Sequence, residues 1–120
     1  MTDAKWVAFI FNQLLSNAIK YTPDHGNIMV SIKKEAQGVS LSVKDSGIGI
    51  PEEDLKRIFD KGFTGRNGRL SKTHSTGLGL YLAKNLAEKL GIQLTAESTE
   101  GKGTTMTLFF PILNFYNEKR

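Results

Sequence analysis

The sequence DSGIGIP, residues 45–51, stands at the end of a segment in which apolar and polar residues alternate. Such a period-2 pattern is typical of a strand with one buried face. The apolar residues of the pattern are Val39, Leu41 and Val43. The same parity places Asp45 on the buried face, where a carboxylate is costly unless hydrogen-bond donors meet it.

The residues after Asp45 predict a turn and then a helix. Gly47 and Gly49 remove side chains next to the carboxylate, so that backbone is able to approach a ligand closely. Pro51 fits the start of a helix that we predict to end near Asp60, with acidic residues first and basic residues later. A plain strand–turn–helix connection with a satisfied aspartate explains the same residues, so short glycine motifs alone leave both interpretations open.

The bulk properties indicate one ordinary globular domain. The chain has 120 residues, of which 39% are hydrophobic and 23% are charged. It has no cysteine, which excludes disulfides and thiolate metal sites. The two histidines, His25 and His74, are too few and too far apart to indicate a zinc site. Without a run of roughly 18 apolar residues or a signal peptide, we expect a cytoplasmic domain.

The net charge of +4 does not single out nucleic acid as a partner, because the basic residues are scattered. Their densest group is Arg66, Arg69 and Lys72, in one glycine-containing loop. We therefore expect no nucleic-acid binding and favour a smaller anion as the partner of that loop.

Hydrophobic periodicity predicts an α+β fold. Residues 61–76 show almost no periodicity, and so long a loop is either functional or disordered. Hairpins separated by helices favour a two-layer sandwich, with about three helices on one face of a mixed, mostly antiparallel sheet. The predicted helices are 3–21, 51–60 and 78–90, the last with Leu78, Leu82, Leu86 and Leu90 in an i+4 repeat, and the predicted strands are 28–33, 39–45, 93–98 and 104–110.

Two further groups of residues indicate chemistry. Gln13, Asn17 and Lys20 fall on a narrow polar stripe at the edge of the apolar face of the first helix. The sequence STGLGL, residues 75–80, opens a later helix, where free N–H groups and the helix dipole favour phosphate. It fits neither a Walker A loop nor a Rossmann fingerprint. A solvated helix face and a helix that begins with small residues are the simpler explanations.

Taken together, these features resemble the catalytic and ATP-binding domain of bacterial sensor histidine kinases. This domain belongs to the superfamily that includes the Hsp90, gyrase and MutL ATPase domains. The resemblance covers residues 5–111, and four motifs in order are far more specific than one glycine motif. Residues 13–23 are similar to the N box, 45–50 to the G1 box, 58–63 to the F box and 76–80 to the G2 box. Residues 5–6, 63–69 and 75–82 look most like the kinases that sense bacitracin and antimicrobial peptides.

The resemblance implies the Bergerat fold, with ATP and Mg²⁺ as cofactors. Asp45 would accept a hydrogen bond from the adenine amino group, and Gly49 would support a water beside it. Asn17 would bind Mg²⁺ through its amide oxygen, Lys20 would reach the phosphates, and Tyr21 would cover the adenine or ribose.

The resemblance also implies contacts from the later motifs. Gly77 and Gly79 would present backbone N–H groups to the phosphates, and Arg66 or Arg69 would meet the γ-phosphate from a mobile lid at 61–76. Thr105 takes the position of a family threonine near the adenine, although strand parity sets it opposite Met106. The remaining implied nucleotide contacts are Gly47, Ile50, Phe63, Thr76, Leu78 and Leu80.

Gln13 departs from the family pattern, which usually has asparagine at this place. The longer amide is still able to hold a metal-bound water, so Gln13 joins Asn17 and Lys20 as a candidate catalytic residue. In the related ATPases a glutamate here activates water. Gln13 cannot act as that base, which argues against a stand-alone ATPase.

The implied function is transfer of the γ-phosphoryl group of Mg·ATP to a histidine. Neither His25, which we expect at the surface, nor His74 has the acceptor pattern. We therefore expect the acceptor on a separate dimerisation domain before residue 1, in a membrane-anchored homodimeric parent that feeds a response regulator. The single domain 1–120 would be a monomer that binds ATP without phosphorylating itself. A nucleotide-binding module without transfer, or an anti-sigma-factor-type serine kinase, remains as an alternative.

Overall fold

The computed structural model of the chain describes residues 4–63 and 78–112. The predicted order of helices and strands is confirmed, and Asp3, where the first helix is predicted to begin, lies outside the described residues. The elements are α1 (Ala4–Tyr21), β1 (Ile28–Glu35), β2 (Gly38–Asp45), α2 (Glu52–Leu55), α4 (Gly79–Lys89), β3 (Gln93–Thr99) and β4 (Gly103–Pro111).

The strands form one four-stranded sheet in the order β1-β2-β4-β3. Each pair of neighbours in it is antiparallel, so the expected mixed character is not seen in the described residues. Two hairpins, β1–β2 and β3–β4, are joined through the pairing of β2 with β4. That pairing sets Val43 opposite Met106 and Asp45 opposite Thr104.

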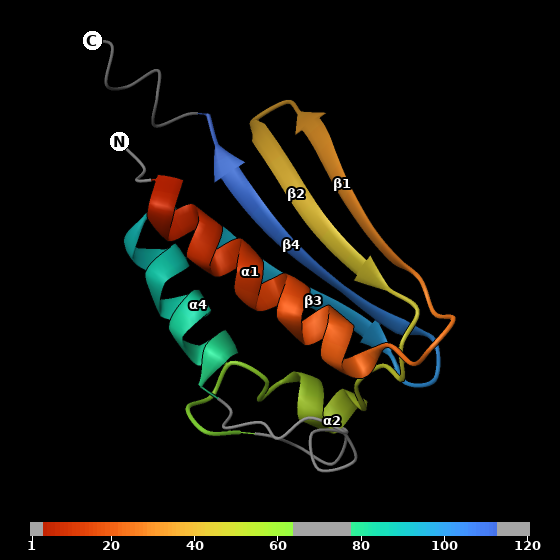
Figure 1. Ribbon diagram of the computed structural model, residues 1–120. Helices are drawn as coiled ribbons and strands as arrows, with labels where there is room; N and C mark the ends of the chain where they lie inside the picture. The colour runs from red at the N-terminus through yellow and green to blue at the C-terminus, as the bar shows by residue number, and fades with distance from the viewer. Residues whose placement is uncertain (1–3, 64–77, 113–120) are drawn as a thin grey trace, which may run out of the picture.

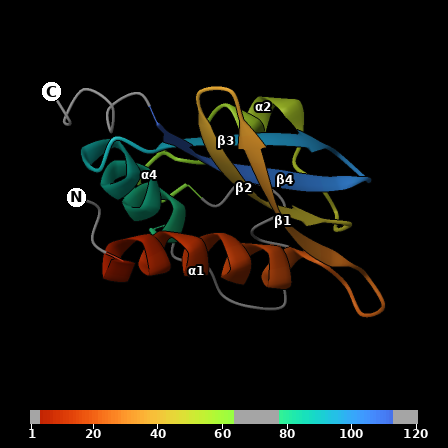
Figure 2. The same ribbon diagram turned by 90° about the horizontal axis from the view of Figure 1, so that it is seen from above.

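The helices α1 and α4 lie together on one face of the sheet, which gives the predicted two-layer α+β sandwich (Figures 1 and 2). The helix predicted to run from Pro51 to Asp60 is much shorter, because α2 ends at Leu55. After it the chain makes tight turns, in which Arg57 N–H donates to Asp54 O at 2.8 Å and Asp60 N–H to Arg57 O at 2.9 Å. None of the described helices is long and apolar enough to cross a membrane.

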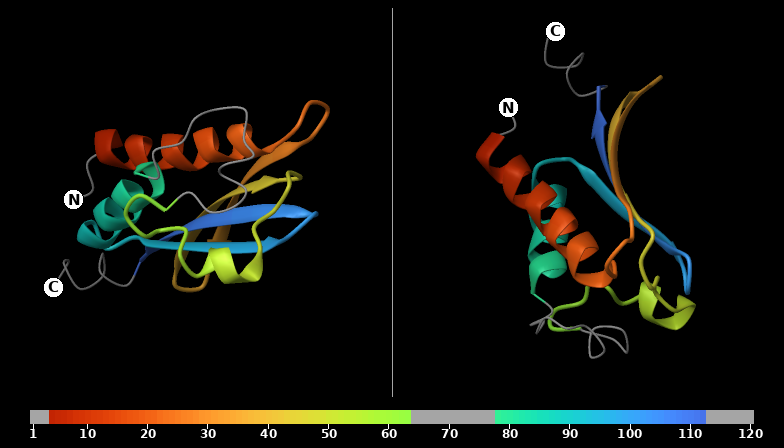
Figure 3. Two further views of the ribbon diagram at one scale, coloured as in Figure 1. Left: turned by 90° about the horizontal axis from the view of Figure 1, so that it is seen from below. Right: turned by 45° about the vertical axis from the view of Figure 1, so that its right-hand side comes forward.

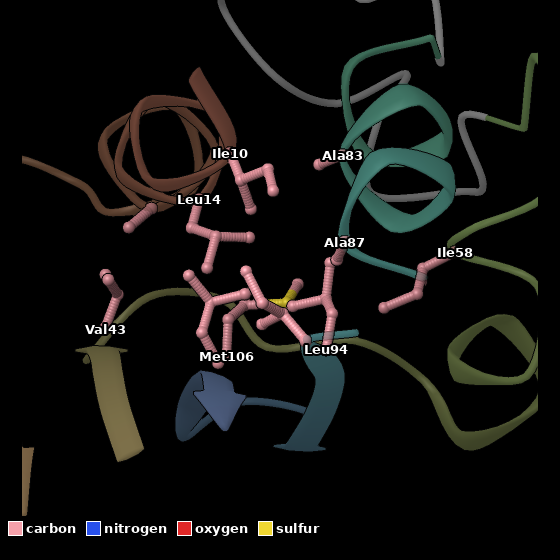
Figure 4. Close-up of a cluster of buried hydrophobic side chains, with 11 residues drawn as sticks. Ile10, Leu14, Val43, Ile58, Ala83, Ala87, Leu94 and Met106 are labelled. Atoms are coloured by element: carbon pink, nitrogen blue, oxygen red, sulfur yellow. The ribbon is translucent and has the colours of Figure 1, made fainter. Parts of the chain in front are cut away.

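The core lies between α1, α4 and the inner face of the sheet (Figure 4). The predicted apolar face of α1 supplies Ile10, Leu14 and Ala18, all buried. From α4 the fully buried residues are Ala83 and Ala87 instead of the leucines of the repeat. These small side chains let the helix pack closely. The side chains of Leu78 and Leu82 stay 39% and 47% exposed, while Leu86 and Leu90 pack partly against the core.

The edge strand β1 lies beyond the helix layer. Val30 and Ile32 share the inner face with Val43 and Leu41, yet they are 46% and 75% exposed. The described helices contact mainly β2 and β3, and β1 is exposed after Ile28. Apolar alternation therefore predicted this strand correctly but not its burial.

We expect Leu14→Ala to lower the free energy of unfolding by about 2–5 kcal/mol, because it leaves a cavity in a fully buried site. Leu82→Ala makes the same chemical change at a side chain that is 47% exposed, and we expect a change within about 0.5 kcal/mol. Urea unfolding of both variants measures the difference. Equal losses would contradict the assignment of the core.

Candidate nucleotide-binding site

Three segments far apart in the sequence meet at one end of the molecule. The C-terminal ends of α1 and β2 and the N-terminal end of α4 lie at the same end of the sandwich, with α2 beside them (Figures 1 and 3). Ile48 N–H donates to Tyr21 O at 3.2 Å, which ties the loop after β2 to the end of α1. The described parts of three predicted motifs are thus neighbours in space.

Asp45 is the buried ionisable group of this region. It is 5% exposed and ends β2 on the inner face, opposite Thr104. Its Oδ1 accepts a hydrogen bond from Gly47 N–H at 2.8 Å. Burial raises the pKa of Asp45 above its usual range, although backbone hydrogen bonds from Gly47 and Thr104 act in the opposite direction. The inward orientation predicted from strand parity is therefore confirmed. The raised pKa reflects the cost of burying the carboxylate.

The two glycines of this loop are required by the packing of the chain itself. A Cβ on Gly47 would collide with the carbonyl oxygen of Tyr21 and lie 2.9 Å from Asp45 Oδ1. Gly49 has a φ of +73°, and a Cβ there would collide with the carbonyl oxygen of Thr99. The prediction that these glycines let backbone approach a ligand stays a prediction, because at both positions the nearest atom is a backbone carbonyl oxygen of this chain.

The same loop is fastened to the β3–β4 hairpin. Ile50 N–H donates to Ser98 Oγ at 2.8 Å, and Gly101 N–H donates to Ile48 O at 2.8 Å. Ser98 Oγ in turn donates to Gly103 O at 2.8 Å. Ser98, which we did not predict, therefore links the loop to the start of β4.

The polar stripe of α1 runs along the edge of this region. Gln13, Asn17, Lys20 and Tyr21 are all half-buried. Lys20 Nζ lies 5.8 Å from the centroid of the Tyr21 ring. The side chain of Gln13 ends against Gly79, the first residue of α4. The stripe therefore lies between the end of β2 and the start of α4.

The position of Thr105 contradicts its predicted contact with the site. It pairs with Lys44 and Glu97 on the outer face of the sheet, away from Asp45. Its neighbour Thr104 is 7% exposed and lies in register with Asp45 on the inner face. The alternation with Met106 and Leu108 carried this signal, since residues of one parity share a face.

Other predicted contacts are divided between the core, the surface and the part of the chain that is not described. Ile50 and Leu80 pack partly against the core, and Leu78 is exposed. Phe63 is half-buried, with the Arg57 guanidinium 4.6 Å from its ring centroid. His25 is exposed, as predicted. Arg66, Arg69, Lys72, His74, Thr76, Gly77 and the lid beyond Phe63 lie outside the described residues.

The donor set fits a magnesium ion that is held mostly by phosphate. Residues 4–63 and 78–112 contain no group of three or more His, Cys, Asp or Glu that could hold a metal. Mg²⁺ commonly keeps waters and takes one or two protein oxygens together with substrate phosphates. The half-buried amide of Asn17, one helical turn from Gln13, offers one oxygen of this kind.

The comparison with protein families identifies the class. Residues 2–114 match the family described as "Histidine kinase-, DNA gyrase B-, and HSP90-like ATPase". The chain belongs to this family, whose ATPases bind ATP, and the resemblance inferred from the four motifs is confirmed.

Individual relatives lie among the sensor kinases. The chain is 47% identical over 113 residues to the sensor protein kinase GraS of Staphylococcus aureus (strain MRSA252). That match covers 94% of this chain and 32% of GraS, so the chain spans about a third of the length of the curated relatives that it matches.

Solved structures of histidine kinases are similar in fold to this chain. The catalytic domain of histidine kinase ThkA, in a nucleotide-free form, is 30% identical with a TM-score of 0.76, over 92% of this chain and 69% of that chain. The mycobacterial sensor histidine kinase MprB shares the fold with a TM-score of 0.81 and 24% identity, over 92% of this chain and 75% of that chain.

The raised pKa of Asp45 predicts a pH dependence of stability. Between the ordinary carboxyl pKa of 3.8 and the raised value, the folded chain binds more protons than the unfolded chain. The contribution of Asp45 to the free energy of unfolding is therefore complete below the ordinary pKa and falls as the pH rises through the raised pKa. Asp45→Asn keeps an acceptor for Gly47 N–H but cannot ionise, so it does not show this fall.

Urea unfolding across this pH range tests the assignment. The stability of Asp45→Asn relative to the wild type should increase as the pH rises. Asp24→Asn removes an exposed carboxylate and serves as the matched control. A constant difference between Asp45→Asn and the wild type would contradict the cost of burying Asp45.

Proposed function

We propose that this chain is the catalytic and ATP-binding domain of a sensor histidine kinase. It binds Mg·ATP and donates the γ-phosphoryl group to a histidine on a separate acceptor domain of the same parent kinase. The observation that supports it most is the buried carboxylate of Asp45, at the end of the molecule where the polar stripe of α1 meets the start of α4.

The adenine end of the site is assigned to Asp45. A buried carboxylate with a raised pKa destabilises the free protein, so a role in binding explains why it is kept. The exocyclic amino group of adenine is a hydrogen-bond donor, and a carboxylate accepts strongly from such a group. Gly47 holds Oδ1 in place through its backbone N–H. Thr104 lies opposite Asp45 in the sheet, and Tyr21 borders the loop that contains Gly49.

The phosphate end is assigned to α1 and α4. The N-cap residue of α4, Leu78, makes no side-chain capping hydrogen bond, and the N–H groups and dipole of a helix start suit an anion. Lys20, in the last turn of α1, supplies a positive charge, and the Asn17 amide supplies an oxygen for Mg²⁺. We extend this end to Gly77, Thr76 and a lid with Arg66 or Arg69 on the strength of the motifs.

In this proposal, phosphoryl transfer depends mainly on how the reacting groups are positioned. A nitrogen of the acceptor imidazole attacks the γ-phosphorus while the bond to the bridging oxygen of ADP breaks, and charge neutralisation supports the transfer. Bound magnesium would offset the negative charge of the phosphates. Gln13 keeps a neutral amide where an activating glutamate would be needed to hydrolyse ATP, so water is not the favoured acceptor.

The wider assembly belongs to the same proposal. The parent is a membrane-anchored homodimer whose acceptor domain supplies the histidine, and a response regulator receives the phosphoryl group downstream. The domain itself is a monomer in the cytoplasm. The relatives named above are a sensor protein kinase and a sensor histidine kinase, which supports this assignment.

We expect Asp45→Asn to weaken ATP binding by about 1–3 kcal/mol, because the carboxylate accepts a charge-assisted hydrogen bond that an amide does not replace. Titration calorimetry with Mg·ATP measures the affinity. Asp24→Asn removes the same charge from an exposed turn and serves as the matched control. Unchanged affinity in Asp45→Asn would contradict the adenine role.

We expect the isolated chain to take up no label from ATP labelled at the γ-phosphate. After a separately produced acceptor domain of the parent kinase is added, the label should appear on that domain in an acid-labile bond. Acid-labile label on the isolated chain would contradict the assignment of the acceptor. ATP binding without transfer would favour a nucleotide-binding module.

A further inference from the structure

Ser98, Thr104 and Asp45 form one row across the inner face of the sheet. The pairing of β3 with β4 sets Ser98 opposite Thr104, and the pairing of β2 with β4 sets Thr104 opposite Asp45. Residues paired in this way point to the same face, and their side chains are neighbours. The hydroxyl of Thr104 therefore lies between a second hydroxyl and a buried carboxylate, and its hydrogen has two possible acceptors.

The hydrogen bonds of Ser98 decide which acceptor receives that hydrogen. Ser98 Oγ accepts from Ile50 N–H at 2.8 Å and donates to the carbonyl oxygen of Gly103 at 2.8 Å. A hydroxyl has one hydrogen and a carbonyl oxygen only accepts, so Ser98 has no hydrogen left for Thr104. In the 2.8 Å contact between Ser98 Oγ and Thr104 Oγ1, Thr104 is therefore the donor.

The same count of hydrogens leaves Asp45 without a hydroxyl donor. Among the described residues, the donors to its carboxylate are the backbone N–H groups of Gly47 and Thr104. Ile28, opposite Asp45 on β1, has an apolar side chain and donates nothing from it. An ionised carboxylate, and a hydroxyl whose hydrogen is already given to Ser98, present only lone pairs to a ligand.

We propose that Ser98 is a positioning residue that turns the Thr104 hydroxyl away from Asp45, so that the base end of the site only accepts hydrogen bonds. This inference rests on the proposed function. A purine with an amino group at its 6-position, as in ATP, offers a hydrogen to these acceptors. A purine with a carbonyl oxygen there, as in inosine triphosphate (ITP), leaves them unpaired, which a binding site penalises strongly. Ser98 thereby contributes to the choice between the two bases through Thr104.

A competing explanation limits Ser98 to fastening the loop after β2. Its bonds to Ile50 N–H and Gly103 O join that loop to the β3–β4 hairpin, whether or not residue 104 has a hydroxyl. The two explanations differ in what the loss of the Ser98 hydroxyl does. If Ser98 directs Thr104, its removal frees a hydrogen that Asp45 then receives. If Ser98 only fastens the loop, the effect does not depend on the hydroxyl of Thr104.

Titration of the Asp45 carboxyl carbon by nuclear magnetic resonance needs no nucleotide and reports whether Asp45 receives this hydrogen. We expect Ser98→Ala to lower the pKa of Asp45, because a new hydroxyl donor favours the ionised form. Thr104→Val should leave that pKa near its wild-type value, since the Thr104 hydroxyl donates to Ser98 in the wild type. In the Thr104→Val background, Ser98→Ala should then lose its effect on the pKa. Ser42→Ala breaks a similar hydroxyl contact, 3.1 Å from Thr107 Oγ1 on the outer face, and serves as the matched control.

Nucleotide selectivity is the second readout. Calorimetry measures the affinities for Mg·ATP and Mg·ITP, and the ratio of the two dissociation constants cancels losses that affect both nucleotides equally. We expect Ser98→Ala to reduce the preference for ATP about tenfold, as a change in one hydrogen bond to a charged group does. Ser98→Thr keeps a hydroxyl at this position and should retain the preference, as should Ser42→Ala.

Three results would overturn the inference. A pKa of Asp45 that rises in Thr104→Val would show that this hydroxyl already donates to the carboxylate in the wild type, and it decides the question even if Ser98→Ala does not fold. An effect of Ser98→Ala on that pKa that is absent, or equal in both backgrounds, would limit Ser98 to fastening the loop. An unchanged preference for ATP over ITP in Ser98→Ala would show that the direction of the hydroxyl does not select the base.

The failure of the proposed function is a separate outcome. A wild-type chain that binds no ATP would contradict the proposed function. The titrations of Asp45 would still decide whether Ser98 directs the hydroxyl of Thr104.

Discussion

The pairing of β2 with β4 is the constraint on which the remaining structure depends. It joins two local hairpins into one sheet, and its register sets Asp45 opposite Thr104 on the face that the helices cover. Gly103 makes the last step of this pairing achievable, because a Cβ there would collide with the carbonyl oxygen of Asp45 and its φ of +128° suits glycine. A one-residue slip of β2 would turn the carboxylate outward and expose Val43.

Given this register, the packing of the helices α1 and α4 determines where the parts of the candidate site lie. Ala83 and Ala87 allow α4 to lie close to the sheet and to α1, so its first turn reaches the polar stripe at Gln13. The end of α1 is held by the loop after β2, through Ile48 and Tyr21. Adenine recognition and phosphate recognition are thus assigned to different elements, whose relative places are fixed by one core.

Periodicity in the sequence was sufficient for features that depend on one segment. It predicted α1, the four strands and the inward orientation of Asp45, because helix and strand repeats assign residues to faces directly. The implied contact of Thr105 was wrong, because its strand parity, opposite to that of Met106, places it on the outer face. The exposure of Ile32 and the role of Ser98 could not be predicted, since they depend on which elements cover a strand or meet a loop.

The same logic explains why the site favours transfer over hydrolysis in our proposal. The position next to the phosphates holds Gln13, which is neutral and is held against Gly79, so the described residues of α1 and α4 supply donors and charge without a base. In this proposal the described residues of α1 and α4 do not supply the nucleophile, so another part of the kinase has to supply it. An acceptor histidine on another domain meets that requirement, whereas water would need an activating group. ATP is therefore expected to remain bound intact until an acceptor approaches.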